Sequence, residues 1–213
     1  MTSHDVVDWV RRRFRIQRVG HGGTLDPAAT GLLILLVGGA TRHARYLLSA
    51  DKTYLATLRL GLSTDTQDAE GKALETREVP SLTVDQIEAA CARFRGDIEQ
   101  EVPAYSAVRI QGKRFYDLAR AGKEVPHRVR RVKVHELKVL AIRLPDVDLR
   151  VTCSSGTYVR TLCADIGAVL GCGGHLNRLV RTQVGPFELS QAVKLDAAVP
   201  ENLLPLDSVK WKF

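Results

Sequence analysis

The order of the predicted helices and strands constrains the fold of this chain most strongly. Eight segments have apolar residues at helical or alternating spacing or, in 32–37, as a continuous run. The predicted helices cover 2–14, 83–95 and 158–170. The predicted strands cover 32–37, 52–60, 132–144, 147–152 and 176–184. Because the strands outnumber the helices and show no regular β-α-β alternation, the sequence predicts an α+β fold around a mixed sheet.

Side chains that cap helices support two of these predictions. Thr2 or Ser3 can cap the first helix, whose last turn is basic as the helix dipole favours. Thr83 can cap the second helix, and Gly96 lies directly beyond its predicted last turn. We therefore expect these helices to begin at those residues.

Composition bounds the class of protein but not its chemistry. Of the 213 residues, 45% are hydrophobic and 26% are charged, which is typical of one globular domain, so we expect residues 1–213 to form a single domain. Lys and Arg total 31 against 24 Asp and Glu, a net charge of +7. Such an excess is typical of proteins that bind polyanions, and also of proteins that merely have a cationic surface.

The four cysteines form no C-x-x-C pair, and no apolar run approaches the roughly 20 residues that span a bilayer. The segment 1–13 has no apolar core of a signal peptide. We therefore expect a cytoplasmic, reduced protein without membrane attachment. Cys172 and His175 have the spacing of zinc ligands, but no second ligand pair accompanies them, so no metal site is predicted.

A glycine-rich loop presents one carboxylate. The stretch 20–27 contains Gly20, Gly22 and Gly23 before Asp26 and Pro27 and cannot propagate a helix, so a ligand can approach its backbone closely. Asp26 can have a chemical role there, or it can simply cap a helix or turn that starts at Pro27. The local pattern leaves both readings open.

A second cluster occurs where a predicted strand meets the third helix. Cys153 and two serines lead through Gly156 to Tyr158 and Arg160. Arg160 can pair with a buried carboxylate or a phosphate, or it can be a solvated surface residue. Tyr158 is equally consistent with a core position.

The segment of about 103–131 is the best candidate for RNA contact, because it is rich in basic residues interleaved with aromatic ones. Its aromatic residues are Tyr105, Phe115 and Tyr116. Its basic residues are Arg109, Lys113, Arg114, Arg120, Lys123, Arg128, Arg130 and Arg131.

The segment 20–31, GHGGTLDPAATG, resembles the catalytic motif of the bacterial tRNA pseudouridine-55 synthases, the TruB family. Further blocks resemble that family in the family's order. They are Asp51–Tyr54, Thr64–Thr66 with Asp68, Phe94–Gly96, Tyr105–Ala107, Gly156–Arg160 and Gly171–Leu176. Several collinear blocks are far more specific than one motif. The resemblance implies a pseudouridine-synthase fold, a mixed, mostly antiparallel sheet flanked by helices with a basic RNA-binding insertion.

The resemblance also implies the chemistry, uridine isomerisation at position 55 in the tRNA T-loop without a cofactor. Asp26 matches the essential aspartate, which attacks ribose or base or first abstracts a ribose proton; the sequence leaves these routes open. Arg160 matches the arginine that keeps this carboxylate ionised and oriented. Tyr54 matches the tyrosine that stacks on the target base.

His21, Tyr158 and Leu179 resemble residues that surround the flipped nucleotide. Flipping a base costs a few kcal/mol of unstacking, which such contacts offset. We expect Arg109, Lys113 and Arg114 to contact the RNA. The expected partner is the tRNA T-stem-loop, with no DNA and no membrane, and a monomer is the default.

The chain departs from the family pattern at both ends. Family members begin with a strand before the segment that starts here at Thr2, so we expect that strand to be missing and a sheet edge to be unpaired. Many continue into a separate C-terminal RNA-binding domain, which we expect to be absent after Phe213. Weaker tRNA affinity would follow, unless the basic segment compensates.

Two other functions fit parts of the sequence. One is a tRNA-binding module with this fold but without catalysis. The other is an RNA methyltransferase that uses Cys153, although no glycine-rich fingerprint of a methyl-donor site is present. A Ser-His-Asp hydrolase fits less well, because the G-x-S-x-G motif is lacking.

Overall fold

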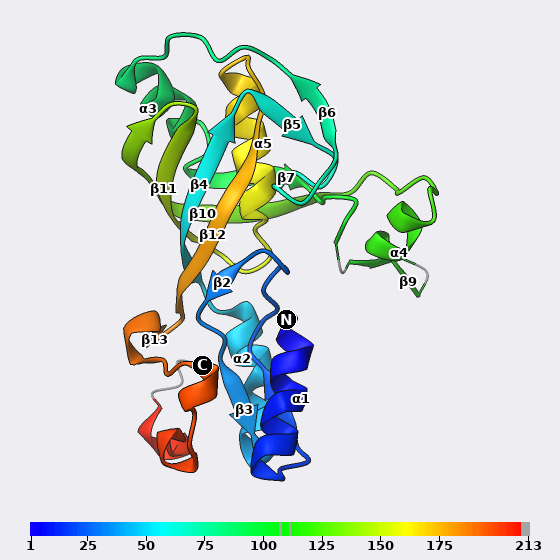
Figure 1. Cartoon of the computed structure of the whole chain (residues 1–213), viewed down its shortest axis with the longest axis vertical. Coiled ribbons are helices and arrows are strands. Elements are labelled where there is room, and N and C mark those ends of the chain that lie inside the picture. The colour runs from blue at the N-terminus through cyan, green and yellow to red at the C-terminus, as the bar shows by residue number, and fades with distance from the viewer. Residues whose placement is uncertain (107, 111, 210–213) are drawn as a thin grey trace. The chain divides into compact units, whose positions relative to one another are not determined.

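The computed structural model describes residues 1–106, 108–110 and 112–209, without the side chains of residues 109, 110, 113 and 114 (Figure 1). The chain packs into two compact units. The terminal unit comprises Met1–Tyr54 and Val180–Phe213, and the central unit comprises Leu55–Leu179. The chain passes from one to the other within strand β4 (Lys52–Leu60) and returns within strand β12 (Gly174–Val184). The expectation of one catalytic domain over 1–213 stays a prediction.

The terminal unit combines two helices with short strands. Strand β1 pairs with β3 antiparallel, and the end of β12 pairs with β2 in parallel and with β13 antiparallel. Four 3₁₀ turns between residues 189 and 208 follow β13. The elements are α1 Ser3–Phe14, β1 Val19–His21, β2 Thr30–Gly31, β3 Leu35–Val37, a 3₁₀ helix Gly38–His43, α2 Ala44–Ser49 and β13 Phe187–Glu188, with parts of β4 Lys52–Leu60 and β12 Gly174–Val184.

The central unit holds the larger part of the sheet. Its strands lie in the order β12, β4, β11, β10 and β7, and helix α3 packs against β10 and α5 (Figure 1). Its further elements are β5 Leu62–Thr64, β6 Ala73–Thr76, α3 Val84–Ala92, β7 Gly96–Glu101, β8 Arg109–Ile110, β9 Lys113–Arg114, α4 Phe115–Arg120, β10 Val129–Arg143, β11 Asp146–Cys153 and α5 Val159–Val169. The expected α+β class, with a mixed, mostly antiparallel sheet, is confirmed.

The helix caps form as the sequence predicts. The Thr2 hydroxyl accepts a hydrogen bond from the Asp5 amide, and the Asp5 carboxylate accepts one from the Thr2 amide. Thr83 and Gln86 make the same reciprocal pair before α3. Each pair satisfies two amides that the helix leaves without partners.

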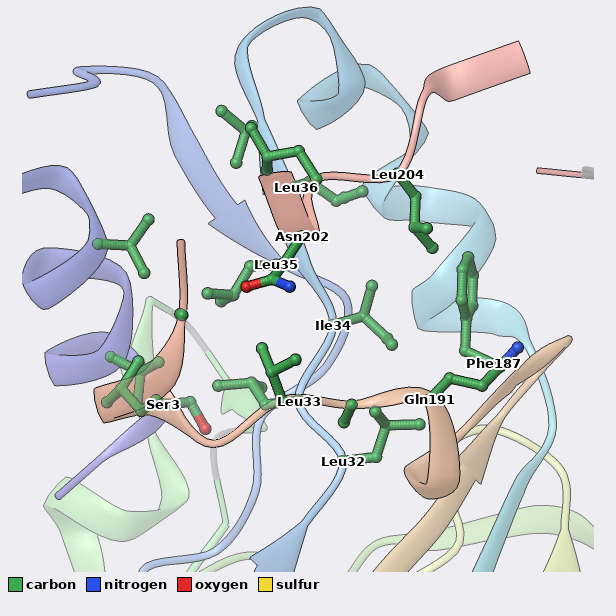
Figure 2. Close-up of a pocket in the computed structure, with 18 of the residues that line it drawn as sticks. Ser3, Leu32, Leu33, Ile34, Leu35, Leu36, Phe187, Gln191, Asn202 and Leu204 are labelled. Carbon is green, nitrogen blue, oxygen red and sulfur yellow. The ribbon is translucent and has the colours of Figure 1, made fainter. Parts of the chain in front are cut away.

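The core of the terminal unit has two apolar clusters. Leu32, Leu36, Leu47 and Val184 are buried together, and α1 buries its apolar face in the second cluster. An apolar groove of about 1440 Å³ runs beside them, lined by α1, the segment 29–40 and the segment 187–209. Figure 2 shows Ile34 on the Phe187 side of this groove and Leu35 on the side of Asn202, toward α1.

Three predicted boundaries are wrong. The strand expected over 32–37 covers only Leu35–Val37, because Leu32 hydrogen-bonds to Arg181 of β12 and the chain then turns to pair with β1. The strand expected over 132–144 begins at Val129, because Val129–Val134 pair with β7. Helix α3 ends at Ala92, and a turn separates it from Gly96.

Candidate active site

Asp26 lies in an exposed turn of the terminal unit. Its carbonyl accepts a hydrogen bond of 2.9 Å from the Ala29 amide, which closes a turn with Pro27 at its second position. No helix starts at Pro27, so Asp26 opens a turn. Its carboxylate is presented to solvent by this short and tightly bonded backbone.

The backbone before Asp26 is fixed by three hydrogen bonds. The Leu25 amide donates to the hydroxyl of buried Ser3 at 2.9 Å, so the first turn of α1 holds the loop next to Asp26. The Gly23 amide donates to His21 Nδ1 at 3.3 Å, and the Gly22 amide donates to the Ile34 carbonyl at 2.9 Å. The loop is therefore preorganised within the terminal unit.

A buried arginine of β12 holds the same loop from its other side. The Arg181 side chain is 2% exposed. It donates from Nε to the Leu32 carbonyl at 2.8 Å, from Nη1 to the Thr24 carbonyl at 3.2 Å and from Nη2 to the Gly23 carbonyl at 3.1 Å. One guanidinium thus links the two ends of the segment that carries Asp26.

Arg181 also interacts electrostatically with Tyr54 and Asp26. Burial lowers the pKa of Arg181. The Tyr54 side chain, which hydrogen-bonds to the guanidinium, and the Asp26 carboxylate raise this pKa but do not outweigh burial. The guanidinium nevertheless stays charged at neutral pH, because arginine titrates so far above this range. A buried positive charge therefore lies beside two of the residues that the sequence singled out.

His21 is held as a neutral side chain in the same loop. Burial lowers its pKa, and the positive charges of His4 and Arg181 lower it further. Because Nδ1 accepts the Gly23 amide, the proton of the neutral ring is on Nε2. His21 thus has at least a structural part in shaping the loop.

The central unit places Arg160 in the first turn of α5. Its side chain is 6% exposed. Nη2 donates to the Tyr105 carbonyl at 2.6 Å, Nη1 lies 3.6 Å from the Asp68 carboxylate, and the buried Nε has no partner among the described residues. The reading of Arg160 as a solvated surface residue is therefore wrong, and the guanidinium keeps a donor for a further acceptor.

The loop that carries Asp68 is itself tightly bonded. Asp68 Oδ1 accepts from the Thr66 hydroxyl at 2.6 Å and from the Glu70 amide at 3.1 Å, which leaves Oδ2 toward Arg160. The Gln67 side chain accepts from the Thr161 hydroxyl at 2.7 Å, beside Arg160 in α5. Asp68 is thus an oriented counter-ion of Arg160.

Tyr158 and Leu179 also have defined positions in the central unit. The Tyr158 ring lies 5.7 Å from the Arg160 guanidinium carbon, a cation–π contact. Its backbone amide and carbonyl both bond to the side chain of Gln100, which is buried. Leu179 is buried in β12.

Cys153 is buried at the end of β11, with 1% of its surface exposed, and none of the four cysteines, all of them among the described residues, forms a disulfide. A nucleophilic cysteine needs access and a stabilised thiolate. The methyltransferase alternative thus gains no support. Within the residues that the structure describes, no three His, Cys, Asp or Glu side chains could hold a metal ion, and no helix has the length and apolar character of a membrane span.

The basic segment forms a hairpin and a short helix, β8, β9 and α4. The Arg120 guanidinium lies 4.7 Å above the Tyr116 ring, which meets Tyr105 edge to face. The side chains of Arg109, Lys113 and Arg114 lie outside the described residues, and their RNA contacts stay a prediction.

Two family models match the chain. The model described as TruB family pseudouridylate synthase (N terminal domain) matches residues 11–159, well over half of the chain. The chain belongs to the TruB family. The model of the tRNA pseudouridylate synthase B C-terminal domain matches residues 160–207. The resemblance inferred from the sequence motifs is thus confirmed.

Individual TruB relatives are closely similar. The tRNA pseudouridine synthase B of Francisella tularensis subsp. tularensis is 48% identical over 197 residues, which cover 92% of this chain and 65% of the relative. That of Chromohalobacter salexigens is 48% identical over 216 residues, which cover 98% of this chain and 70% of the relative. The chain thus spans about two thirds of the length of these relatives.

Chains of two solved complexes share the fold. A chain of a Cbf5-Nop10-Gar1 complex is 34% identical, with a TM-score of 0.69 over 88% of this chain and 46% of that chain. A chain of an H/ACA RNP bound to a substrate RNA containing 2'-deoxyuridine is 31% identical, with a TM-score of 0.69 over 92% of this chain and 48% of that one.

Sequence reasoning missed Arg181 and Asp68 in this TruB-family chain. Arg181 follows Leu179 by two positions in a predicted strand, so both side chains point to the same face. A charged residue on the buried face of a strand was the available signal. Asp68 was part of a recognised block, but nothing local in the sequence links it to Arg160.

Proposed function

We propose that this protein isomerises uridine to pseudouridine at position 55 in the tRNA T-loop. The reaction breaks the bond from ribose C1′ to uracil N1, forms one from C1′ to C5, and moves a proton from C5 to N1. The observation that carries the proposal is an exposed aspartate on a preorganised turn in a TruB-family chain. No oxidant or reductant is needed, so we expect no cofactor.

Asp26 is the proposed catalytic carboxylate. A carboxylate can act as nucleophile, leaving group and base in one site without a cofactor. The bonds that hold its turn support the assignment, because a carboxylate fixed before the substrate binds loses little freedom on reaching the reactive geometry. Tyr54, which bonds to Arg181 in the same unit, is the proposed stacking partner of the target base.

Arg160 is the proposed partner of the negative charge in the reaction. It is buried, already oriented by Tyr105 and Asp68, and its Nε–H has no partner among the residues that the structure describes. A buried donor without a partner costs about 1–3 kcal/mol. A bound acceptor that satisfies this donor recovers that free energy.

The proposal assigns His21, Tyr158 and Leu179 to the space around the flipped nucleotide. His21 is neutral and half-buried, Tyr158 offers a ring beside Arg160, and Leu179 is apolar. Apolar and aromatic surfaces of this kind stabilise an unstacked base.

The proposed partner is the tRNA T-stem-loop, with no DNA. The net charge of +7 favours binding to a polyanion, and Arg109, Lys113 and Arg114 of the basic segment are the proposed RNA contacts. We propose a monomer in the cytoplasm, a reducing compartment that suits four cysteines without a disulfide.

The test is the release of tritium from an unmodified tRNA transcript labelled at C5 of uridine, followed by mapping of the modified position. We expect one equivalent of release per tRNA, and none from a transcript with cytidine at position 55. Release from both transcripts would refute the site, and tight binding without release would favour the binding-module alternative.

A further inference from the structure

We propose that Arg181 is a positioning residue, which fixes the Asp26 turn and the Tyr54 side chain in one arrangement before the tRNA binds. The inference rests on the proposed function and adds a residue to it. Its basis is the three hydrogen bonds from one buried guanidinium to carbonyls on both sides of the turn.

The geometry requires an arginine at this position. The carbonyls of Gly23 and Thr24 precede Asp26, whereas that of Leu32 follows it, and the three bonds use three different nitrogens. A planar guanidinium spans such separated acceptors, whereas the donors of a lysine radiate from one atom. Arg181→Lys therefore keeps the charge but loses part of the clamp.

The backbone of Arg181 takes part as well. Its carbonyl accepts the Leu32 amide at 2.8 Å, and Gly31 lies so close that a Cβ there would meet that carbonyl oxygen at 2.3 Å. Gly31 also has a φ of +99°, which disfavours a side chain. The segment after Asp26 is therefore held against β12 by both the side chain and the backbone of one residue.

The positive charge of Arg181 acts on Tyr54 and Asp26 although the Arg181 side chain is buried. Tyr54 hydrogen-bonds to the guanidinium, and the Asp26 carboxylate lies within its electrostatic influence. With 2% of its surface exposed, Arg181 acts through its neighbours rather than on the substrate. Loss of the guanidinium would release both groups together, and a misplacement of about 1 Å costs roughly a hundredfold in rate.

Lys52 provides a matched structural control. It is also a buried cation that donates to three carbonyls, those of Leu47, Leu48 and Ala50 at 3.0, 2.8 and 2.6 Å, but these close the end of α2. Lys52→Met and Arg181→Met each remove one buried cation together with its hydrogen bonds to three backbone carbonyls. Only the second substitution removes them from the Asp26 turn.

The experiment combines single-turnover rates, tRNA affinity and hydrogen exchange for the wild type and three variants, Arg181→Met, Arg181→Lys and Lys52→Met. For Arg181→Met we expect the rate at saturating tRNA to fall about a hundredfold, with the Kd within about twofold, and amide exchange in 22–33 to accelerate. Arg181→Lys should lie between it and the wild type. Lys52→Met should lower Tm but keep the rate and the exchange in 22–33.

The outcomes separate this inference from the proposed function. An inactive wild type would refute the function, whereas faster exchange in 22–33 would still support the clamp. An active wild type with undiminished rates in Arg181→Met would overturn the inference. If Arg181→Met does not fold, Arg181→Lys decides: an unchanged rate and unchanged exchange overturn the inference, and a reduced rate with retained affinity supports it.

Discussion

The ion pair between Arg160 and Asp68 leads to a quantitative prediction about the central unit. Arg160→Met leaves the Asp68 carboxylate, whose side chain is 13% exposed, without its counter-ion. Removal of one partner of a buried ion pair costs about 3–5 kcal/mol, and we expect the lower end, because Thr66 and Glu70 still donate to Asp68. For a domain of this size, that corresponds to a fall in Tm of about 6–12 °C.

A double-mutant cycle isolates the pair. Asp68→Asn keeps an acceptor for Thr66 and Glu70 but places an amide N–H₂ toward Arg160. This substitution is therefore also expected to destabilise the folded protein. The double variant should be more stable than the sum of both losses predicts, with a coupling of about 1–2 kcal/mol. The assay is urea unfolding followed by circular dichroism, with Asp65→Asn as the control, because Asp65 accepts from the Lys72 amide in the same loop. Additive losses would refute an oriented pair.

Three further predictions concern pH, RNA binding and chemistry. Burial raises the pKa of Asp165 to about 6, above its value of 3.8 in the unfolded chain, so the folded state loses stability as pH rises through 6. Asp165→Asn should therefore raise stability by about 1 kcal/mol at pH 8, allowing for solvent screening, and change little at pH 4, as calorimetry at both pH values can check. Arg114→Glu with Lys123→Glu should weaken tRNA binding and reduce its dependence on salt concentration; an unchanged slope would contradict the assigned contacts. Cys153→Ala should keep pseudouridine formation, whereas the methyltransferase alternative requires its loss.

The elements with a clear local signal could be predicted from the sequence. Strand β4 has the predicted bounds Lys52–Leu60, and its Ala56, Leu58 and Leu60 are buried, as their alternation indicates. The capping pairs at Thr2 and Thr83 form because all of their members lie within four residues of one another. Such features depend on residues that are close in the chain, so they can be predicted from one sequence.

Features that depend on distant partners could not be predicted in this way. The apolar run 32–37 has the composition of one strand, but Leu32 bonds to Arg181, 149 residues later, and only Leu35–Val37 pair with β1. The pairing of Arg160 with Asp68 likewise joins two segments that no periodicity relates. The motifs singled out Asp26 and Arg160 as candidates, whereas the side chains around them emerged only from the tertiary structure.

The measurement that tests the central claim most directly compares the wild type with Asp26→Ala in tritium release from tRNA labelled at C5 of uridine, with tRNA binding measured alongside. Asp196→Ala serves as the control, because Asp196 is another exposed aspartate of the terminal unit. The account predicts release by the wild type and by Asp196→Ala, and no release by Asp26→Ala despite undiminished binding. Release by Asp26→Ala at the wild-type rate would contradict it.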